Sequence, residues 1–436
     1  MIEKTVELAD AGVRFHTVKT DKFKMSRLSF NFILPADASR SPRTRIMLAT
    51  MMRGCAKYPS VVAINKRLDE LYGSTVTWRA ATVGERHTFR ISCEVLSNKY
   101  RLAGDDESIV KSVCDVIMEI LFAPMLTEDG LLSESNFESE KKLAIDAIKA
   151  KINDQKSYAA EKCKSLMMKG HPAGISIEGT AEQIEKMTLF EVSENIKYFL
   201  ENSLLECYYV GNDDIDDVID EIGKKFSSIV RNVGLDIGKE SAFVREDSAN
   251  LKVLEETMSV SQSRLNIGCT SGIVMSDPEY YAMCLFNEIY GGSSVAKLFM
   301  NVREKQSLCY YCYSSFGSAT GTIMIGCGIK SENREKAYSE IEKQLLEMQN
   351  GNFTEDDIET AKRTVISGLL QIHDSPSAIE AFKIRRFLAG IDESPALVAE
   401  KIRAVSKEDI VAVAAKVRFD SVYFLCGNGE EDEYDE

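Results

Sequence analysis

Histidine, the side chain most often used in acid–base and metal chemistry, is scarce in this sequence. The four histidines are His16, His87, His171 and His373, and no two lie within a helical turn of one another. Two ring nitrogens on one helix face could hold a metal ion, but this spacing offers no such pair. His373 is followed directly by an aspartate, yet adjacent residues do not face each other on a helix. We therefore predict a polar helix end at His373 and a loop at His171.

Eleven cysteines are scattered through apolar segments of the chain. Such a number indicates a disulfide framework in a small secreted protein, whereas in a long chain with no export signal it favours reduced, buried thiols. Cys309 and Cys312 form a CxxC pair, but they fall in a predicted strand rather than at a helix N-terminus, where a thiolate is favoured. We predict reduced cysteines that are mostly buried, and redox chemistry at the CxxC pair stays an alternative.

The composition indicates a folded, acidic protein. Apolar residues make up 44% and charged residues 28% of the 436 residues, and the formal net charge is -15. Because this charge repels phosphate backbones, nucleic acid is not expected as a partner. The first residues lack a basic start followed by an apolar stretch, and no segment reaches the roughly 18 apolar residues of a membrane span. The sequence therefore predicts a cytoplasmic protein with no membrane partner.

The elements that must position the reactive residues occur twice. Segments 207–212 and 423–428 are both short β-rich runs that stop at Gly-Asn, and each follows a helix opened by a hydroxyl N-cap. Segments 134–142 and 355–363 both begin long amphipathic helices. The offset between matching segments stays between 216 and 221 residues, so the two halves are predicted to share one fold.

Each half combines period-2 stretches with amphipathic helices, which is typical of an α+β fold. We predict two duplicated α/β sandwich halves with antiparallel-rich sheets and packed helices. The expected boundaries are 1–231 for the N-terminal half, 232–258 for a charged linker and 259–436 for the C-terminal half. Within them, strands are predicted at 24–34, 75–78, 87–95, 264–269 and 322–329, and a helix at 105–121.

Two motifs resemble those of a known family. Residues 52–59 read MRGCAKYP, and residues 290–310 read YGGSSVAKLFMNVREKQSLCY. The first resembles the FKGT.K.P stretch that follows the inverted zinc motif of insulinase/pitrilysin peptidases, and the second resembles their GG..S.LF..VREK.GLAY signature. The likeness covers nearly the whole chain. It implies two duplicated α/β halves joined by a linker, as in the mitochondrial processing peptidase and its small bacterial relatives.

Active members of that family carry H-x-x-E-H, in which two histidines hold zinc and the glutamate activates water. Counting back from Gly54, the matching positions here are Arg45, Leu48 and Ala49. The family's third ligand, a glutamate on the long helix, falls at Ala147. None of these side chains can bind zinc at neutral pH. The resemblance therefore implies a metalloendopeptidase relative that binds no cofactor of its own and is inactive alone.

The resemblance retains two substrate-contacting positions, Arg303 and Tyr310, in the C-terminal half. A guanidinium and a phenol hydroxyl can both donate to a carbonyl oxygen as it becomes an oxyanion. In the alternative interpretation, Arg303 pairs with a nearby carboxylate and Tyr310 belongs to the core. Gly291 and Gly292 are predicted to end one helix and permit the turn into the next, rather than to contact a ligand.

Together these features predict a non-catalytic subunit that binds peptide and pairs with a zinc-bearing homologue for proteolysis. Zinc is then expected on the partner, and a homodimer is the alternative assembly in its absence. Two alternatives remain: a structural or assembly protein of the same fold, like the core subunits of the respiratory cytochrome complex, and an active metallopeptidase with a relocated site. For the second alternative, the sequence offers no nucleophile elbow and no paired histidines.

Overall fold

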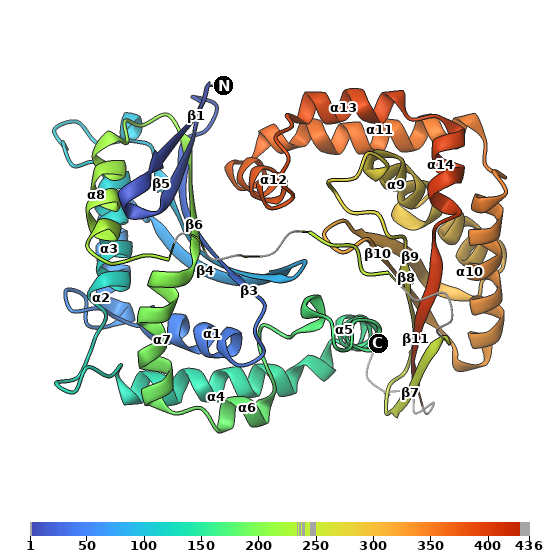
Figure 1. Cartoon of the computed structure of the whole chain (residues 1–436), viewed down its shortest axis with the longest axis horizontal. Helices are drawn as coiled ribbons and strands as arrows, with labels where there is room; N and C mark the ends of the chain where they lie inside the picture. The colour runs from blue at the N-terminus through green and yellow to red at the C-terminus, as the bar shows by residue number, and fades with distance from the viewer. Residues whose placement is uncertain (1, 233, 235–236, 238–239, 245–249, 428–436) are drawn as a thin grey trace. The chain divides into compact units, whose positions relative to one another are not determined.

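The computed structural model describes residues 2–232, 234, 237, 240–244 and 250–427. The chain forms two compact units, which Figure 1 colours along the sequence. Unit 1 comprises Met1–Lys149, Ile175–Gly238 and Ser375–Ala381, and unit 2 comprises Ala150–Gly174, Lys239–Asp374 and Phe382–Glu436. The units follow the two halves of the sequence except for segments 150–174 and 375–381, which each group with the other half.

Unit 1 is built on a six-stranded sheet with the order β1-β2-β6-β3-β5-β4. Its pairs are antiparallel except β2 with β6. The strands are Ile2–Leu8 (β1), Val13–Lys19 (β2), Met25–Pro35 (β3), Thr75–Val83 (β4), Arg86–Leu96 (β5) and Leu204–Gly211 (β6). The helices are Arg40–Met51 (α1), Val61–Glu70 (α2), Ile109–Phe122 (α3), Glu134–Ala150 (α4), Ala181–Glu185 (α6), Leu189–Asn202 (α7) and Asp216–Ser227 (α8).

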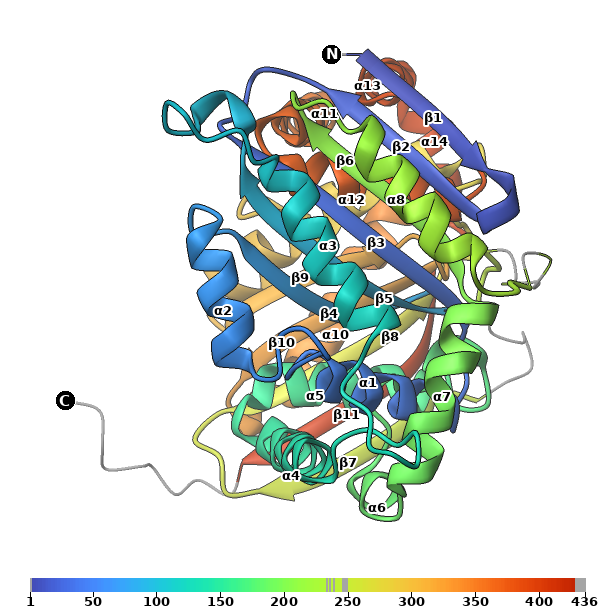
Figure 2. The same cartoon turned by 90° about the vertical axis from the view of Figure 1, so that its left-hand side faces the viewer.

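One face of this sheet carries the apolar core of unit 1. Alternate residues of β3, among them Phe30 and Phe32, are fully buried there, and α3 contributes Ile117 and Leu121 to the same cluster. A strand places every second side chain on one face, and a helix places every third or fourth on one stripe. Figure 2 shows α3 and α8 lying across the sheet.

The opposite face of the same strands is polar. Arg27 on β3 and Arg90 on β5 both pair with the carboxylate of Glu380, which is fully buried. Arg27 Nε donates to Glu380 Oε2 at 2.6 Å, and Arg90 Nε lies 3.0 Å from Oε1. Two guanidinium groups compensate the buried charge, which would otherwise be costly. This ion cluster attaches segment 375–381 to unit 1.

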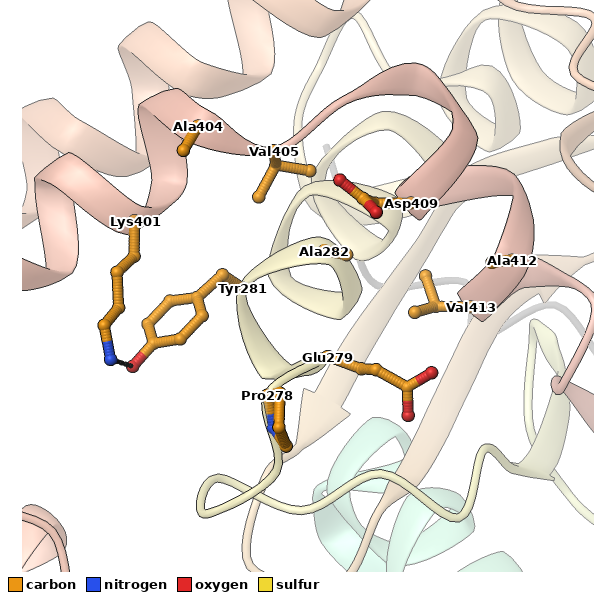
Figure 3. A pocket seen from close by; sticks show the side chains of 10 residues that line it. All are labelled: Pro278, Glu279, Tyr281, Ala282, Lys401, Ala404, Val405, Asp409, Ala412 and Val413. Carbon is orange, nitrogen blue, oxygen red and sulfur yellow. Dashed lines mark hydrogen bonds between the residues drawn. The ribbon is translucent and has the colours of Figure 1, made fainter.

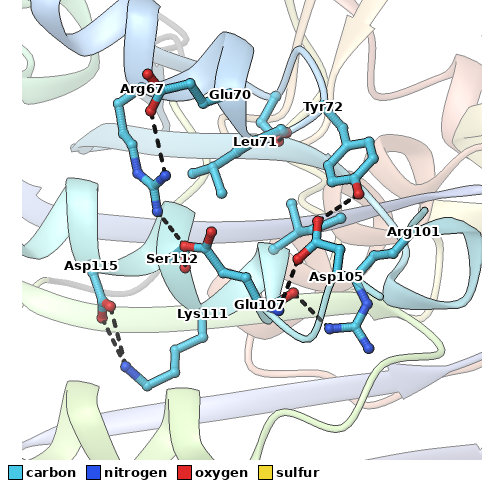
Figure 4. A network of polar contacts seen from close by, with 12 residues as sticks. Arg67, Glu70, Leu71, Tyr72, Arg101, Asp105, Glu107, Lys111, Ser112 and Asp115 are labelled. Carbon is cyan, nitrogen blue, oxygen red and sulfur yellow. Dashed lines mark hydrogen bonds and ion pairs between the residues drawn. The ribbon is translucent and has the colours of Figure 1, made fainter. Parts of the chain in front are cut away.

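A polar network fixes the segment between α2 and α3 (Figure 4). Tyr72 Oη donates to Asp105 Oδ2 at 2.6 Å, and Arg67 on α2 pairs with Glu107. Asp105 Oδ1 also accepts from the Glu107 backbone N–H at 3.0 Å. Such a local turn competes with helical backbone bonding. For this reason the helix predicted at 105–121 begins only at Ile109.

Unit 2 is built on a five-stranded sheet with the order β7-β11-β8-β10-β9. Its pairs are antiparallel except β7 with β11. The strands are Lys252–Met258 (β7), Ser263–Thr270 (β8), Cys309–Gly317 (β9), Thr322–Ile329 (β10) and Arg418–Gly427 (β11). The helices are Gln155–Met167 (α5), Tyr280–Asn287 (α9), Arg334–Gln349 (α10), Glu355–Gln371 (α11), Pro395–Ala404 (α13) and Lys407–Ala414 (α14), with π-helical segments at Glu288–Gly292 and Phe299–Lys305. Helix α12, Pro376–Leu388, is divided between the units, because its residues up to Ala381 belong to unit 1 and those from Phe382 to unit 2.

The predicted linker 232–258 differs from the structure at its C-terminal end. Residues 252–258 form β7, which pairs in parallel with β11 at the edge of the sheet. Most residues of β7 are exposed, and partly buried and exposed positions do not alternate regularly along it. The strand therefore lacks the period-2 pattern by which a half-buried strand is recognised in a sequence. Of the remaining predicted linker, residues 233, 235–236, 238–239 and 245–249 lie outside the described residues.

Both faces of the unit 2 sheet are covered by helices. The larger apolar cluster lies on the side of α9, α10 and α14. On the other face, Ala159 and Cys163 of α5 pack against Tyr423 and Leu425 of β11. The predicted α+β class with antiparallel-rich sheets is thus confirmed in each unit. Within the described part of the chain, no helix is both long and apolar enough to traverse a lipid bilayer.

Candidate functional site

The helix aligned with the family's zinc motif is α1. Asp37 caps its start, because Asp37 Oδ1 accepts backbone N–H bonds from Ser39 at 2.8 Å and Arg40 at 2.7 Å. The three aligned positions share one region of this helix, being three and four residues apart. Arg45 and Ala49 are partly exposed, and Leu48 is buried. This set offers one guanidinium and two hydrocarbon groups, none of which is a zinc ligand.

The fourth aligned position lies on α4. Ala147 is exposed, and its methyl group has no ligand atom. Seven residues earlier on the same helix, the Glu140 carboxylate pairs with Arg53, which follows α1. An ion pair thus connects α4 to the end of α1. Across residues 2–232, 234, 237, 240–244 and 250–427, no group of three or more His, Cys, Asp or Glu side chains is arranged to hold a metal ion.

Two histidines lie on strands of the unit 1 sheet and have structural partners. The His87 ring is fully buried and bonds Ser41 Oγ at 2.5 Å and the Ile175 carbonyl at 3.2 Å. His16 Nε2 lies 2.7 Å from Oε2 of the buried Glu206. Both rings are therefore held in place by neighbouring polar groups.

The other two histidines lie where the sequence predicted. His373 is part of a 3-10 turn, Ile372–Asp374, at the end of α11. His171 directly precedes the short 3-10 turn Pro172–Gly174. The predicted helix end and loop are confirmed.

The glycine pair lies where α9 ends. The π-helical segment Glu288–Gly292 continues α9 and stops at the pair, as predicted. The physical reason differs, because neither Gly291 nor Gly292 has a positive φ. A Cβ on Gly291 would lie 2.6 Å from the Ser314 backbone nitrogen on β9. Glycine is thus required for close approach of a strand, and not for a left-handed turn.

Arg303 lies on the π-helical segment Phe299–Lys305, directly before β9. Its guanidinium carbon is 4.6 Å from the centre of the Phe299 ring, and its Nε is 3.6 Å from Glu304 Oε1. The side chain is 42% exposed. An exposed ion pair of this length contributes at most about 1 kcal/mol. The guanidinium is therefore held over an aromatic ring while its outer edge stays open to a ligand.

Tyr310 occupies a β-bulge on the edge strand β9. Cys309 is paired with Ile329 and Tyr311 with Gly328, so Tyr310 is the extra residue between two consecutive pairs. Its side chain is 56% exposed. Of the alternative interpretation, the core position of Tyr310 is therefore wrong, whereas the pairing of Arg303 with a nearby carboxylate, that of Glu304, is confirmed. The phenol is available for a ligand beside the sheet edge.

The sequence patterns did not identify Cys327, a third cysteine that lies on β10 next to this bulge. Cys327 on β10 is paired in register with Cys312, so three cysteines meet where the sequence predicted a CxxC pair. The hairpin closes at Gly317 and Thr322, and five residues back along each strand reach Cys312 and Cys327. Counting outward from this turn was the signal that could have identified the third thiol.

A pocket of about 460 Å³ opens on the helical side of unit 2 (Figure 3). Tyr281 and Lys401 line it, and both bind the Glu393 carboxylate. Burial raises the pKa of Glu393, but the hydrogen bonds from Lys401 and Tyr281 outweigh it, so the pKa is lowered overall. Asp409, another lining residue, accepts the backbone N–H of Ser406, the N-cap of α14, in a capping box. These polar groups already serve the fold, and no predicted site residue lies among them.

Comparisons with known proteins agree with the fold. A family model described as "Peptidase M16 inactive domain" matches residues 186–365. The "Probable inactive metalloprotease YmfF" of Bacillus subtilis is 30% identical over 416 residues, covering 95% of this chain and 96% of that protein. "Cytochrome b-c1 complex subunit 1, mitochondrial" of Saccharomyces cerevisiae is 21% identical over 451 residues, covering 95% and 91%.

Among solved structures, a conserved protein from Enterococcus faecalis V583 is similar with a TM-score of 0.88 and 25% identity, covering 99% of this chain and 100% of that one. The likeness to the Bacillus protein likewise extends over both units. The insulinase/pitrilysin resemblance that the motifs indicated is thereby confirmed. The chain belongs to the M16, or insulinase/pitrilysin, family of zinc peptidases and matches that family's inactive-domain model.

Proposed function

We propose that this protein is a non-catalytic M16 subunit that binds peptide and pairs with a zinc-bearing homologue for proteolysis. One observation carries the proposal: this family member has no ligand side chain at the aligned zinc positions, but the two positions at which the resemblance implies substrate contact are open to solvent. Arg303 is 42% exposed and Tyr310 is 56% exposed. Such a chain supplies donors for a substrate while another chain supplies the metal.

The chemistry of the two donors suits a peptide carbonyl. A guanidinium keeps its charge at every physiological pH and can donate two parallel bonds, and a phenol adds one neutral donor. Both could stabilise an oxygen that gains negative charge during attack by zinc-bound water on the partner. The cation–π contact of Arg303 with Phe299 restrains the guanidinium without using its outer nitrogens.

The position of β9 supports peptide binding by main-chain pairing. In the strand order, β9 stands at the edge of the unit 2 sheet. An edge strand can accept an extended peptide as an additional strand. A bulge at Tyr310 interrupts that edge and aims the tyrosine outward. We infer that a peptide paired along β9 would pass both donors.

The decisive experiment mixes this chain with a zinc-bearing M16 homologue from the same organism. Peptidase activity should rise with added chain and level off at one chain per partner. The control uses a partner whose motif glutamate is replaced by glutamine, which should abolish activity at every ratio because the general base is lost. A flat titration despite demonstrated binding would overturn the peptidase-subunit proposal.

A structural role is the second candidate, because the chain resembles a subunit of the yeast cytochrome b-c1 complex along nearly its whole length. In that case the chain would bind partners and leave their activity unchanged. Metal analysis addresses the remaining alternative, a relocated active site. The purified chain should contain far less than one zinc per molecule. Stoichiometric zinc together with chelator-sensitive proteolysis would favour the relocated site instead.

A further inference from the structure

The thiols of Cys309, Cys312 and Cys327 form a cluster that the proposed function does not use. Cys312 and Cys327 face each other across the β9–β10 hairpin and are 2% and 0% exposed. Cys309 packs against the same apolar core but remains partly exposed. All three are free thiols. The cluster therefore has two thiols inside the core and one that solvent reaches.

The bulge at Tyr310 explains why Cys309 belongs to this cluster. In a regular strand, residues three apart point to opposite faces, so Cys309 would point away from Cys312. One extra residue in β9 reverses this relation. Cys309 is paired with Ile329 and Cys312 with Cys327, two positions apart on β10 and hence on one face. The backbone irregularity that exposes Tyr310 thus also turns Cys309 toward the two buried thiols.

The surroundings favour a negative charge on Cys309. Hydrogen bonds with the Cys312 and Cys327 side chains lower the pKa of Cys309, burial opposes them, and the charge of Arg303 assists them. The hydrogen bond with Cys309 raises the pKa of both Cys312 and Cys327, which stay protonated as donors. One thiol is thus the acceptor and two are donors. A thiolate that is reachable from solvent is a nucleophile.

Metal binding would be the other use for three thiols. Within the residues that the structure describes, however, no three His, Cys, Asp or Glu side chains are arranged to hold a metal ion, and Cys309, Cys312 and Cys327 are no exception. One partly exposed thiol beside two buried thiols fits nucleophilic chemistry at a single sulfur instead.

We propose that Cys309 is a thiol-modification site that reacts with small-molecule disulfides, with the buried thiols of Cys312 and Cys327 beside it on one face of the hairpin. The Cys309 sulfur attacks one sulfur of the disulfide and forms a new S–S bond. The old S–S bond breaks, and the leaving thiolate departs with the electron pair. No other oxidant is needed, and a reducing thiol reverses the reaction.

The adduct has a consequence for the neighbouring donors, and this part rests on the proposed function. A group attached at Cys309 adds bulk directly beside Tyr310 and removes the negative charge that Arg303 faces. In the complex with a zinc-bearing partner, peptide hydrolysis should fall as Cys309 is modified and recover on reduction.

The test of the modification site uses the full chain alone, with 5,5′-dithiobis(2-nitrobenzoate) as the probe and peptide mass spectrometry to locate each adduct. Cys309 should react before Cys284 and Cys426, which are the other partly exposed cysteines among the described residues. Lowering the pH from 8 to 6 should slow an ordinary thiol about 75-fold, given a pKa of about 8.5. The reaction of Cys309 should slow by less than about threefold over the same pH range.

Variants separate the roles of the neighbours. Cys312→Ala and Cys327→Ala each remove a donor and should make the reaction of Cys309 more pH-dependent, whereas Cys327→Ser keeps an O–H donor and should largely preserve the wild-type profile. Should the alanine variants melt early, the comparison of Cys309 with Cys426 in the wild-type chain still decides. Preferential reaction of Cys426, or an ordinary pH profile at Cys309, would overturn the proposal. The assay needs neither partner nor peptide, so its failure is separable from failure of the proposed function.

Discussion

At the residue scale, Arg303 and Tyr310 carry the proposed activity, and they are held in different ways. Arg303 lies over the Phe299 ring at the end of a π-helical segment, whereas Tyr310 projects from a bulge in a strand. A π-helical segment and a bulge both insert an extra residue into a regular element, and both occur often at functional sites. The geometry of these two residues therefore depends on two irregularities only a few residues apart.

Arg303→Ala and Tyr310→Phe should lower the turnover of the complex while leaving its assembly intact. Removing one well-placed oxyanion donor costs about 100- to 1000-fold in turnover, and a donor used mainly for substrate binding would raise the Michaelis constant instead. The arginine should matter more, because its charge is permanent and its fork reaches two oxygens. Steady-state kinetics with a short peptide measures both effects.

Matched controls for these variants are Arg363→Ala, at an exposed position on α11, and Tyr100→Phe, at a tyrosine that is 39% exposed in unit 1. Both controls should retain wild-type kinetics. If the Arg303 and Tyr310 variants assemble and do the same, these residues have a structural role only.

A second prediction at this scale concerns Asp105. Its pKa is lowered first by the hydrogen bond from Tyr72 and then by the Glu107 backbone N–H. A carboxyl with a depressed folded pKa contributes stability that is present above its unfolded pKa, about 3.9, and is lost as pH falls through the folded pKa. Tyr72→Phe should therefore lower the melting temperature at pH 7, and the difference from wild type should shrink toward pH 3. A difference that is constant with pH would contradict this role of Asp105.

At the element scale, the π-helical segment Glu288–Gly292, which continues α9, packs against β9, the strand that carries Tyr310. The helix and the strand approach so closely at Gly291 and Ser314 that a side chain does not fit between them. Sequence patterns predict where such elements begin and end, but not how near they pass. The distance arises from the apolar cluster that both elements share.

Gly291→Ala should destabilise unit 2 because its Cβ would meet the Ser314 backbone nitrogen at 2.6 Å. Overpacking of this kind costs about 1–3 kcal/mol. The control is Gly368→Ala on α11, where the new Cβ meets nothing within 4 Å. There the substitution should stabilise the helix by about 0.5–1 kcal/mol. Denaturant unfolding measures both, and equal effects of the two substitutions would refute the close-approach argument.

At the scale of the whole molecule, the two sequence halves exchange one segment each. Segment 375–381 contributes Glu380 to the polar face of the unit 1 sheet, more than 340 residues away in sequence from its partners on β3. Segment 150–174 contributes α5 to unit 2. Neither assignment follows from periodicity, because an amphipathic helix shows which of its faces is buried but not the sheet against which it packs.

Glu380→Ala should destabilise unit 1 strongly, because Arg27 and Arg90 would lose the carboxylate that balances them. Breaking a buried ion pair by removing one partner costs about 3–5 kcal/mol. Glu359→Ala is the control, since Glu359 pairs with the nearby Lys362 and its side chain is 60% exposed. That change should stay within about 1 kcal/mol. A loss at Glu380 no larger than at Glu359 would show that the cluster is not needed for the fold of unit 1.

The sequence by itself determined the local features of this protein. Periodicity predicted the core strands, and hydroxyl N-caps at Thr188 and Ser406 predicted two helix starts that the structure confirms. Motif resemblance identified the family. These features are local because capping, alternation and motif spacing depend on residues only a few positions apart.

Only the tertiary structure decided which distant groups meet. It placed Cys327 opposite Cys312 on the neighbouring strand, placed Glu380 between two arginines, and exposed Tyr310 at a bulge. It also revealed β7 inside the predicted linker. Each of these depends on strand register or on packing between elements far apart in the chain, and a one-residue change in register reverses the face on which a side chain lies. Local sequence patterns do not fix that register, because it is set by the core that the elements form together.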